Sequence, residues 1–168
     1  MELEETGASQ KWHKVQTHLV GAYNLYNCLA AIAVGINFGI DRKQICHALE
    51  NYVPTNSRSQ LVDTGRNRLV VDAYNANPSS MMAALENFQM MTTGPGETKM
   101  AILGDMRELG EASREEHQKV VDLLEASGMR DVWLVGQEFG QTICDYRKFS
   151  DVGQVKQAIA SEQPAGCL

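Results

Sequence analysis

The chain has 168 residues, of which 43% are hydrophobic and 21% charged, and its formal net charge is −6. This is the composition of an ordinary globular protein of one domain or of a domain with an attached fragment, and its acidic balance argues against a general nucleic-acid or anionic membrane surface. No apolar run approaches the ~18 residues of a membrane-spanning helix and the acidic N-terminus has no apolar signal core, so we expect a cytoplasmic protein.

The first part of the chain predicts a helical hairpin. The first 16 residues are polar and leave two readings open, a frayed end or a strand separated from its sheet. From Asn24 onwards apolar side chains recur at helical spacing, and Gly35 and Gly39 are expected to close this helix. Asp41 predicts the N-cap of a second helix, which carries Ile45, Ala48 and Leu49. The two helices share one apolar face but are too small to form a core alone.

The rest of the chain predicts an α/β domain. Residues 54–57 are rich in turn formers and predict a linker, and a strand hairpin follows at 60–62 and 69–72. Helix and strand patterns then alternate, with helices at about 79–91, from 113, at 138–144 and from 151, and strands at 100–103 and 132–135. Ser113 and Glu116 have the spacing of a capping box, and Asp151 predicts the last N-cap, with Val155 and Ile159 facing inward. The alternation predicts a mostly parallel sheet with helices on both faces.

One strand end combines several features of a ligand site. The apolar run 69–71 ends on Asp72, and after a polar turn Asn77 precedes Pro78, which predicts an N-cap with proline at the first helical position. Open α/β sheets bind ligands beyond the carboxyl ends of their strands, and a helix N-terminus favours anions such as phosphate. The simpler alternative is a capped turn with a solvated Asp72.

Four ordered blocks of sequence resemble the Mur ligases. The blocks are residues 17–27, 54–58, 72–80 and 102–110, and the resemblance runs from about Thr17 to Gln163. The last block is similar to the branch of the family that adds D-Ala-D-Ala, rather than to relatives such as folylpolyglutamate synthase. The resemblance implies a Rossmann-like C-terminal domain and ATP-dependent amide formation through an acyl phosphate. The acceptor would be UDP-MurNAc-tripeptide, in peptidoglycan synthesis.

The resemblance also implies how the chain is divided. Residues 1–56 would be the end of the central ATP-binding domain, and residues 57–168 the C-terminal domain, truncated before its last strand. The sequence contains no G-x-x-x-x-G-K-[ST] phosphate loop, which the family carries upstream of the matching residues. We therefore expect the chain to be inactive by itself.

The resemblance assigns the nucleotide side of the site to residues on both sides of the linker. Asn24 and Asn27 lie on one helical face, where two amides can donate to and accept from an adenine edge, although Asn24 could instead cap the helix. Arg58 would reach the γ-phosphate as an arginine finger does, or would be a solvated surface arginine. Ser57 stands where the family usually has glycine.

The remaining assignments concern the two loops after the strands. Asp72 could accept hydrogen bonds from ribose hydroxyls, and the side chains of Asn75 and Asn77 could bind nucleotide or acyl phosphate, unless Asn77 only caps the helix. Three charged residues after Gly104 could orient a zwitterionic dipeptide, the alternative being a solvated and self-paired loop; they are Asp105, Arg107 and Glu108.

The sequence predicts no metal site made only of protein ligands, because its four cysteines and four histidines lack ligand spacing. The expected cofactors are ATP and Mg²⁺, with the Mg²⁺ ligands mostly outside this chain. The expected partners are UDP-MurNAc-tripeptide and D-Ala-D-Ala, without nucleic acid or membrane, and we expect a monomer. Three alternatives stay open: another Mur ligase relative, a non-catalytic nucleotide-binding module, and a receiver-like domain. The sequence does not show the clustered acidic residues that a receiver domain needs near its first strand.

Overall fold

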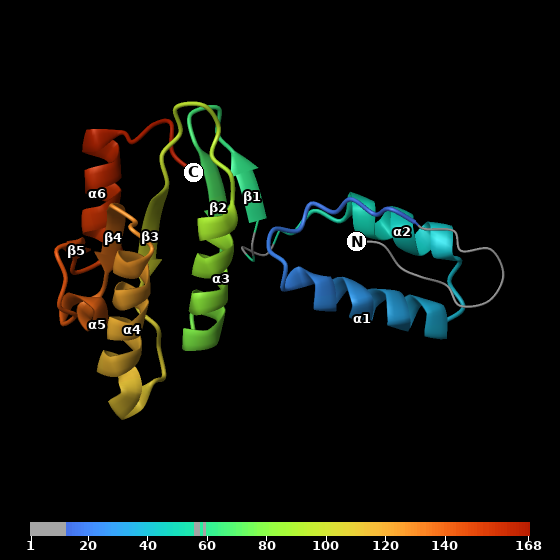
Figure 1. Ribbon diagram of the computed structural model, residues 1–168, viewed down its shortest axis with the longest axis horizontal. Helices are drawn as coiled ribbons and strands as arrows, with labels where there is room; N and C mark the ends of the chain where they lie inside the picture. The colour runs from blue at the N-terminus through green and yellow to red at the C-terminus, as the bar shows by residue number, and fades with distance from the viewer. Residues whose placement is uncertain (1–12, 56–57, 59) are drawn as a thin grey trace.

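The structure is a computed structural model that describes residues 13–55, 58 and 60–168. It consists of a helical hairpin beside an α/β domain (Figure 1). The predicted boundary between residues 56 and 57, most of the polar N-terminal segment, and Ser57 lie outside the described residues.

The hairpin is formed by α1 (Asn24–Asn37) and α2 (Arg42–Asn51). Gly39, with φ at +73°, lies in the turn after α1, whereas Gly35 lies inside α1, so the expectation that it closes the helix is wrong. A Cβ at Gly35 would lie 2.8 Å from Cδ1 of Ile45, so the glycine lets the two helices approach. Cys28 and Ile45 are buried, but several apolar side chains of the expected shared face are exposed, among them Leu25 and Ile36. The hairpin has only a thin core of its own.

The sheet domain contains the predicted strand hairpin and a parallel sheet. β1 (Gln60–Asp63) pairs antiparallel with β2 (Arg68–Val71), and β3 (Met100–Gly104), β4 (Asp131–Val135) and β5 (Arg147–Phe149) pair in parallel in that order. The strand β5 has no counterpart in the sequence-based prediction. Backbone bonds from Leu168 N to Thr98 O and from Arg68 N to Cys167 O, both 2.9 Å, connect the last residues to β2 and to the segment leading into β3. These residues therefore join the two sheets.

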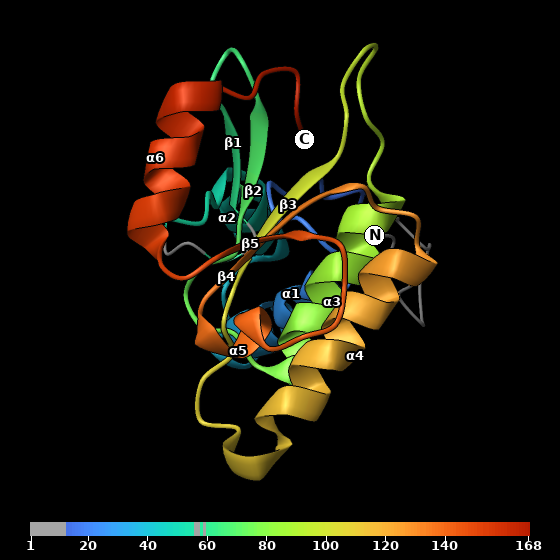
Figure 2. The same ribbon diagram turned by 90° about the vertical axis from the view of Figure 1, so that its left-hand side faces the viewer.

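Helices cover both faces of the parallel sheet, as predicted (Figure 2). On one face lie α3 (Pro78–Met90) and α4 (Ser113–Ala126), and on the other lies α6 (Val152–Glu162). Side chains alternate along β4: Val132 and Leu134 enter the core beneath α3 and α4, whereas Trp133 and Val135 pack with α6. Of the α6 residues expected to face inward, Val155 is buried, but Ile159 is 39% exposed and Ala158 takes its place.

Three of the four predicted helix caps are confirmed. Asp41 accepts from Lys43 N, Asn77 from Ser80 N and Asp151 from Gln154 N, at 2.9–3.1 Å. The fourth prediction is wrong, because the N-cap of α4 is Ala112 and makes no side-chain bond. A 3₁₀ turn, Gly110–Ala112, leads directly into α4, so Ser113 is already helical. The short helix α5 covers Gln137–Gly140 rather than residues 138–144.

We expect an acid-sensitive contact between β2 and the loop before β3. The Arg68 guanidinium forms hydrogen bonds with both carboxylate oxygens of Glu97, and Gly94 N–H donates to the same carboxylate at 2.6 Å. These bonds lower the pKa of Glu97 from 4.5 to about 2. Because the folded-state pKa is the lower one, the stabilisation is fully present above pH 4.5 and is lost as the pH falls toward 2.

Urea unfolding of the chain at a series of pH values tests this expectation. Glu97→Gln should be less stable than the wild type at pH 7, and the difference should shrink between pH 4.5 and 2, because the wild type loses its charged contact in that range. A difference in unfolding free energy that stays constant with pH would contradict the prediction.

Candidate functional site

The carboxyl ends of β3 and β4 open into a cavity of about 880 Å³. Its lining comes from the loop after β3, the first turns of α4, α5 and α6, and Ala73 just after β2. The cavity lies where parallel α/β sheets bind their ligands. It also brings two of the sequence blocks together, since Ala73 belongs to residues 72–80 and the loop after β3 to residues 102–110.

Asp105 connects the loop after β3 to α5. Its carboxylate oxygens accept hydrogen bonds from Glu138 N at 3.0 Å and Phe139 N at 2.9 Å. Gly136 precedes α5 with φ at +122°, and a Cβ there would overlap the Asp105 carboxylate. Asp105 therefore caps α5, and both of its oxygens already have protein donors. This cap could not be foreseen from local spacing, because its partners lie more than 30 residues along the chain.

His117 supports the same loop from beneath. The side chain is fully buried in α4, and its Nε2 accepts from Met106 N at 3.0 Å. Its Nδ1 lies 2.7 Å from the carbonyl oxygen of Ser113, which can only accept, so Nδ1 is the donor in this contact. The ring also meets Phe139 of α5 edge-on, with the ring centroids 4.6 Å apart.

His117 and Ser113 did not emerge as site residues from the sequence. The available signal was their spacing of four residues, in helical register with the buried side chains of Val120, Val121 and Leu124. Ser113 Oγ donates to Glu138 Oε2 at 2.6 Å, which connects the start of α4 to α5. Two helices and one loop thus hold the wall of the cavity in place through buried or partly buried hydrogen bonds.

Arg107 and Glu108 supply the outward charges of this loop. Both are exposed and both line the cavity. Glu108 has φ at +64°, in the left-handed region that few residues other than glycine adopt. In the part of the chain that the structure describes, neither side chain forms an ion pair, so the two charges do not neutralise each other. They remain available to a ligand that carries both charges.

In the segment after β2, Asn77 caps α3 as predicted, and several polar side chains form hydrogen bonds within the turn itself. Asn77 Oδ1 accepts from Ser80 N and from Ser79 Oγ, both at 2.9 Å, and Asn75 Oδ1 accepts from Ala76 N at 2.9 Å. Asp72 follows β2 directly and is exposed. The amide oxygens of both asparagines are thus used locally, which leaves their NH₂ groups as donors for a ligand.

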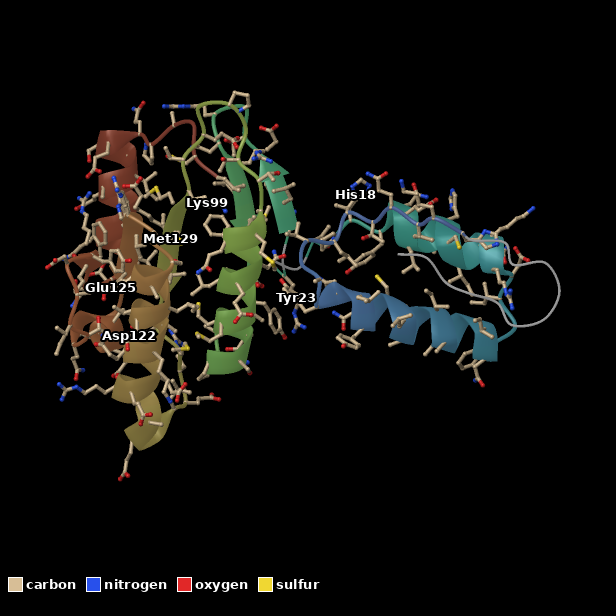
Figure 3. The ribbon with its side chains drawn as sticks, viewed as in Figure 1. His18, Tyr23, Lys99, Asp122, Glu125 and Met129 are labelled. Carbon is tan, nitrogen blue, oxygen red and sulfur yellow. The ribbon has the colours of Figure 1, made fainter. Side chains whose placement is uncertain are left out.

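The asparagine pair at the start of α1 is held by side-chain hydrogen bonds. Asn24 Nδ2 donates to Val20 O at 2.7 Å, and Asn24 Oδ1 accepts from Asn27 Nδ2 at 2.9 Å. The N-cap of α1 is Tyr23, so Asn24 does not cap the helix but orients Asn27, which is exposed. Figure 3 shows Tyr23 at the end of α1 that faces the α/β domain. The Asn27 amide can both accept and donate there, as an adenine edge requires.

Arg58 lies beyond the linker and contacts the segment after β2. Its guanidinium carbon is 3.8 Å from the ring centroid of Tyr74. The structure thus gathers the predicted residues in three places: Asp105, Arg107 and Glu108 at the cavity, Arg58 against the segment that carries Asp72, Asn75 and Asn77, and Asn24 with Asn27 on the hairpin.

Two further properties concern the described residues as a whole. Across residues 13–55, 58 and 60–168, no group of three or more His, Cys, Asp and Glu side chains could hold a metal ion. In the same part of the chain, none of the helices has the length and apolar character needed to cross a membrane.

Comparisons with known proteins point in one direction. Residues 57–164 match the family model described as Mur ligase, glutamate ligase domain. Relatives named UDP-N-acetylmuramoyl-tripeptide–D-alanyl-D-alanine ligase include those of Treponema pallidum (36% identity over 133 residues, 79% of this chain) and Escherichia coli (34% over 121 residues, 71% of this chain). The chain spans only 28% and 26% of the lengths of these two relatives.

Solved structures share the fold. A crystal structure of MurF from Acinetobacter baumannii matches 99% of this chain with a TM-score of 0.78 at 23% identity, over 38% of its own length. A MurF ligase from Thermotoga maritima, solved in complex with ADP, matches 95% of this chain with a TM-score of 0.72 at 21% identity, over 36% of its length. The α/β, Rossmann-like fold class expected from the sequence is thereby confirmed.

Proposed function

The chain belongs to the Mur ligase family, and we propose that it forms part of an ATP-dependent ligase that joins D-Ala-D-Ala to UDP-MurNAc-tripeptide in peptidoglycan synthesis. The observation that carries this proposal is the cavity of about 880 Å³, in which Ala73 of the nucleotide-side segment meets Arg107 and Glu108 of the loop after β3. An activated acceptor and an amine must meet for amide formation, and this cavity lies between the two segments assigned to them. We further propose a monomeric enzyme that acts in the cytoplasm.

The residues present fit the adenosine side of ATP. The Asn27 amide, held by Asn24, can satisfy an adenine edge, and Asp72 at the end of β2 can accept from ribose hydroxyls. The NH₂ groups of Asn75 and Asn77 would donate to phosphate or acyl-phosphate oxygens, and Arg58 would balance their charge. Bound ATP would supply the phosphoryl group that activates the acceptor carboxylate. The Mg²⁺ ligands would lie mostly outside this chain.

The loop after β3 fits a small zwitterion. A planar guanidinium such as that of Arg107 can bind a carboxylate through two parallel hydrogen bonds, and the Glu108 carboxylate can accept from an ammonium group. Asp105, which caps α5, would contribute mainly by fixing the course of this loop. In this proposal the dipeptide binds with its carboxylate toward Arg107 and its amine toward Glu108.

Activity of the protein expressed from its complete gene tests the proposal. Phosphate release from ATP should require both UDP-MurNAc-tripeptide and D-Ala-D-Ala. Phosphate release with a folate and glutamate instead would identify a folylpolyglutamate synthase, and nucleotide binding without turnover would identify a non-catalytic module. Either outcome would overturn the proposed reaction.

The isolated chain should neither hydrolyse ATP nor form the amide. Its sequence contains no G-x-x-x-x-G-K-[ST] motif, and phosphoryl transfer depends on such a phosphate cradle. A phosphate-release assay on the purified chain, compared with a mock purification from cells that lack it, measures this directly. Release above the mock level that rises with protein concentration would mean that a complete site exists within these residues.

A further inference from the structure

Tyr74 is the aromatic residue of the segment after β2, and the proposed function assigns no role to its side chain. Its ring lies beneath the Arg58 guanidinium, 3.8 Å from ring centroid to guanidinium carbon, although Tyr74 itself is 64% exposed. Among the described residues, no hydrogen bond or ion pair engages Arg58. The aromatic face is thus the contact that locates this guanidinium.

The geometry of the contact decides what it can do. A guanidinium stacks through its flat face, whereas all five of its N–H donors lie in its plane. Stacking on Tyr74 therefore orders Arg58 and leaves its donors free for phosphoryl oxygens. A carboxylate partner would occupy the same donors and would have to be displaced before catalysis.

The position of Tyr74 in the chain connects Arg58 to the segment assigned to the nucleotide. Tyr74 lies two residues after Asp72 and one before Asn75, in the segment assigned to the nucleotide, whereas Arg58 follows the linker. An arginine beside a linker would otherwise sample many rotamers, and ordering it during the reaction costs conformational entropy. Because the ring of Tyr74 already holds the Arg58 side chain, this entropy cost is met before the phosphoryl group binds.

We propose that Tyr74 is a positioning residue, an aromatic platform that holds the Arg58 guanidinium ready for the transferring phosphoryl group of the ligase. This inference rests on the proposed function, because it needs Arg58 to act on that group. Tyr74 acts through Arg58 and through the face of its ring, so its hydroxyl is dispensable.

The contact itself is testable on the chain described here. Nuclear magnetic resonance of the chain should show the side-chain methylene signals of Arg58 shifted upfield by the aromatic ring. Tyr74→Leu should abolish the shift and Tyr74→Phe should keep it. Tyr52→Leu, which removes another exposed tyrosine, is the matched control and should also keep it. An unshifted Arg58 in the wild type would overturn the inference.

The catalytic consequence is tested in the protein expressed from its complete gene. Tyr74→Leu should lower kcat about fivefold with little change in KM for ATP, as expected for loss of one partly exposed cation–π contact. Tyr74→Phe should keep the wild-type kcat, because it retains the aromatic ring. If the tyrosine hydroxyl were required, Tyr74→Phe would lose activity as well. In an Arg58→Ala background, Tyr74→Leu should have no further effect.

The outcomes separate this inference from the function on which it rests. If Arg58→Ala lowers kcat but Tyr74→Leu does not, the platform role is overturned and the ligase assignment stands. A higher kcat in Tyr74→Leu would mean that the stack restrains Arg58 in a resting state, which also overturns the proposal. If no substrate supports turnover in the wild type, the proposed function itself fails.

Discussion

Arg58→Ala is expected to lower kcat of the ligase expressed from its complete gene by about 100-fold, or about 2.7 kcal/mol, with a much smaller change in KM for ATP. Arg58 would balance charge that develops on the phosphoryl group during transfer, and such interactions appear in kcat. Arginine fingers elsewhere contribute about 10³–10⁵-fold, but here Mg²⁺ and a lysine of the phosphate loop would share that role. Steady-state kinetics at saturating ATP measure the loss.

Two substitutions control this result. Arg58→Lys should recover little activity, because an ammonium group cannot reproduce the planar fork or stack on Tyr74 in the same way. Arg114→Ala removes an exposed arginine at the start of α4 and should leave kcat near the wild-type value. If Arg58→Ala retains full kcat, Arg58 is a surface arginine and has no part in the site.

Gly136→Ala should destabilise the chain by about 3–5 kcal/mol, through backbone strain combined with the loss of a partly buried contact. Gly136 has φ at +122°, which side chains other than glycine rarely adopt, and the new Cβ would overlap the Asp105 carboxylate. Asp105 would have to leave the N–H groups of Glu138 and Phe139, so the cap of α5 would be lost as well. Urea unfolding of the wild-type and variant chains gives the difference.

Gly128→Ala is the matched control for the backbone term. Gly128 has φ at +72°, yet a Cβ there would meet nothing within 4 Å, so its substitution should cost only about 1 kcal/mol. In an Asp105→Ala background, Gly136→Ala should cost less than in the wild type, because the clash is gone. Equal costs for Gly128→Ala and Gly136→Ala would show that the Asp105 contact does not constrain this turn.

The sequence by itself determined the elements whose causes lie within a few residues. Asp41, Asn77 and Asp151 cap their helices as predicted, because an N-cap needs only a side-chain acceptor two or three residues before a free N–H. The alternation of helix and strand patterns was likewise enough to predict a mostly parallel sheet, since parallel strands need a crossover helix between them. The place of Arg107 and Glu108 beside the cavity follows in the same way from their position shortly after β3, whereas their role toward a ligand stays a prediction.

Tertiary structure decided where the polar groups are committed. Asp105 is a charged residue in a loop after a strand, as ligand-binding residues often are, yet its oxygens accept hydrogen bonds from the N–H groups of residues 138 and 139. Ser113 has the spacing of a capping box, yet its hydroxyl donates to Glu138. The contact of Arg58 with Tyr74 arises in the same way, across a strand hairpin. Local periodicity indicates which face of a helix or strand is apolar. The partner of a hydrogen bond or an aromatic stack also depends on which distant segment of the chain packs against that face. That is set by chain packing, which no short window of sequence contains.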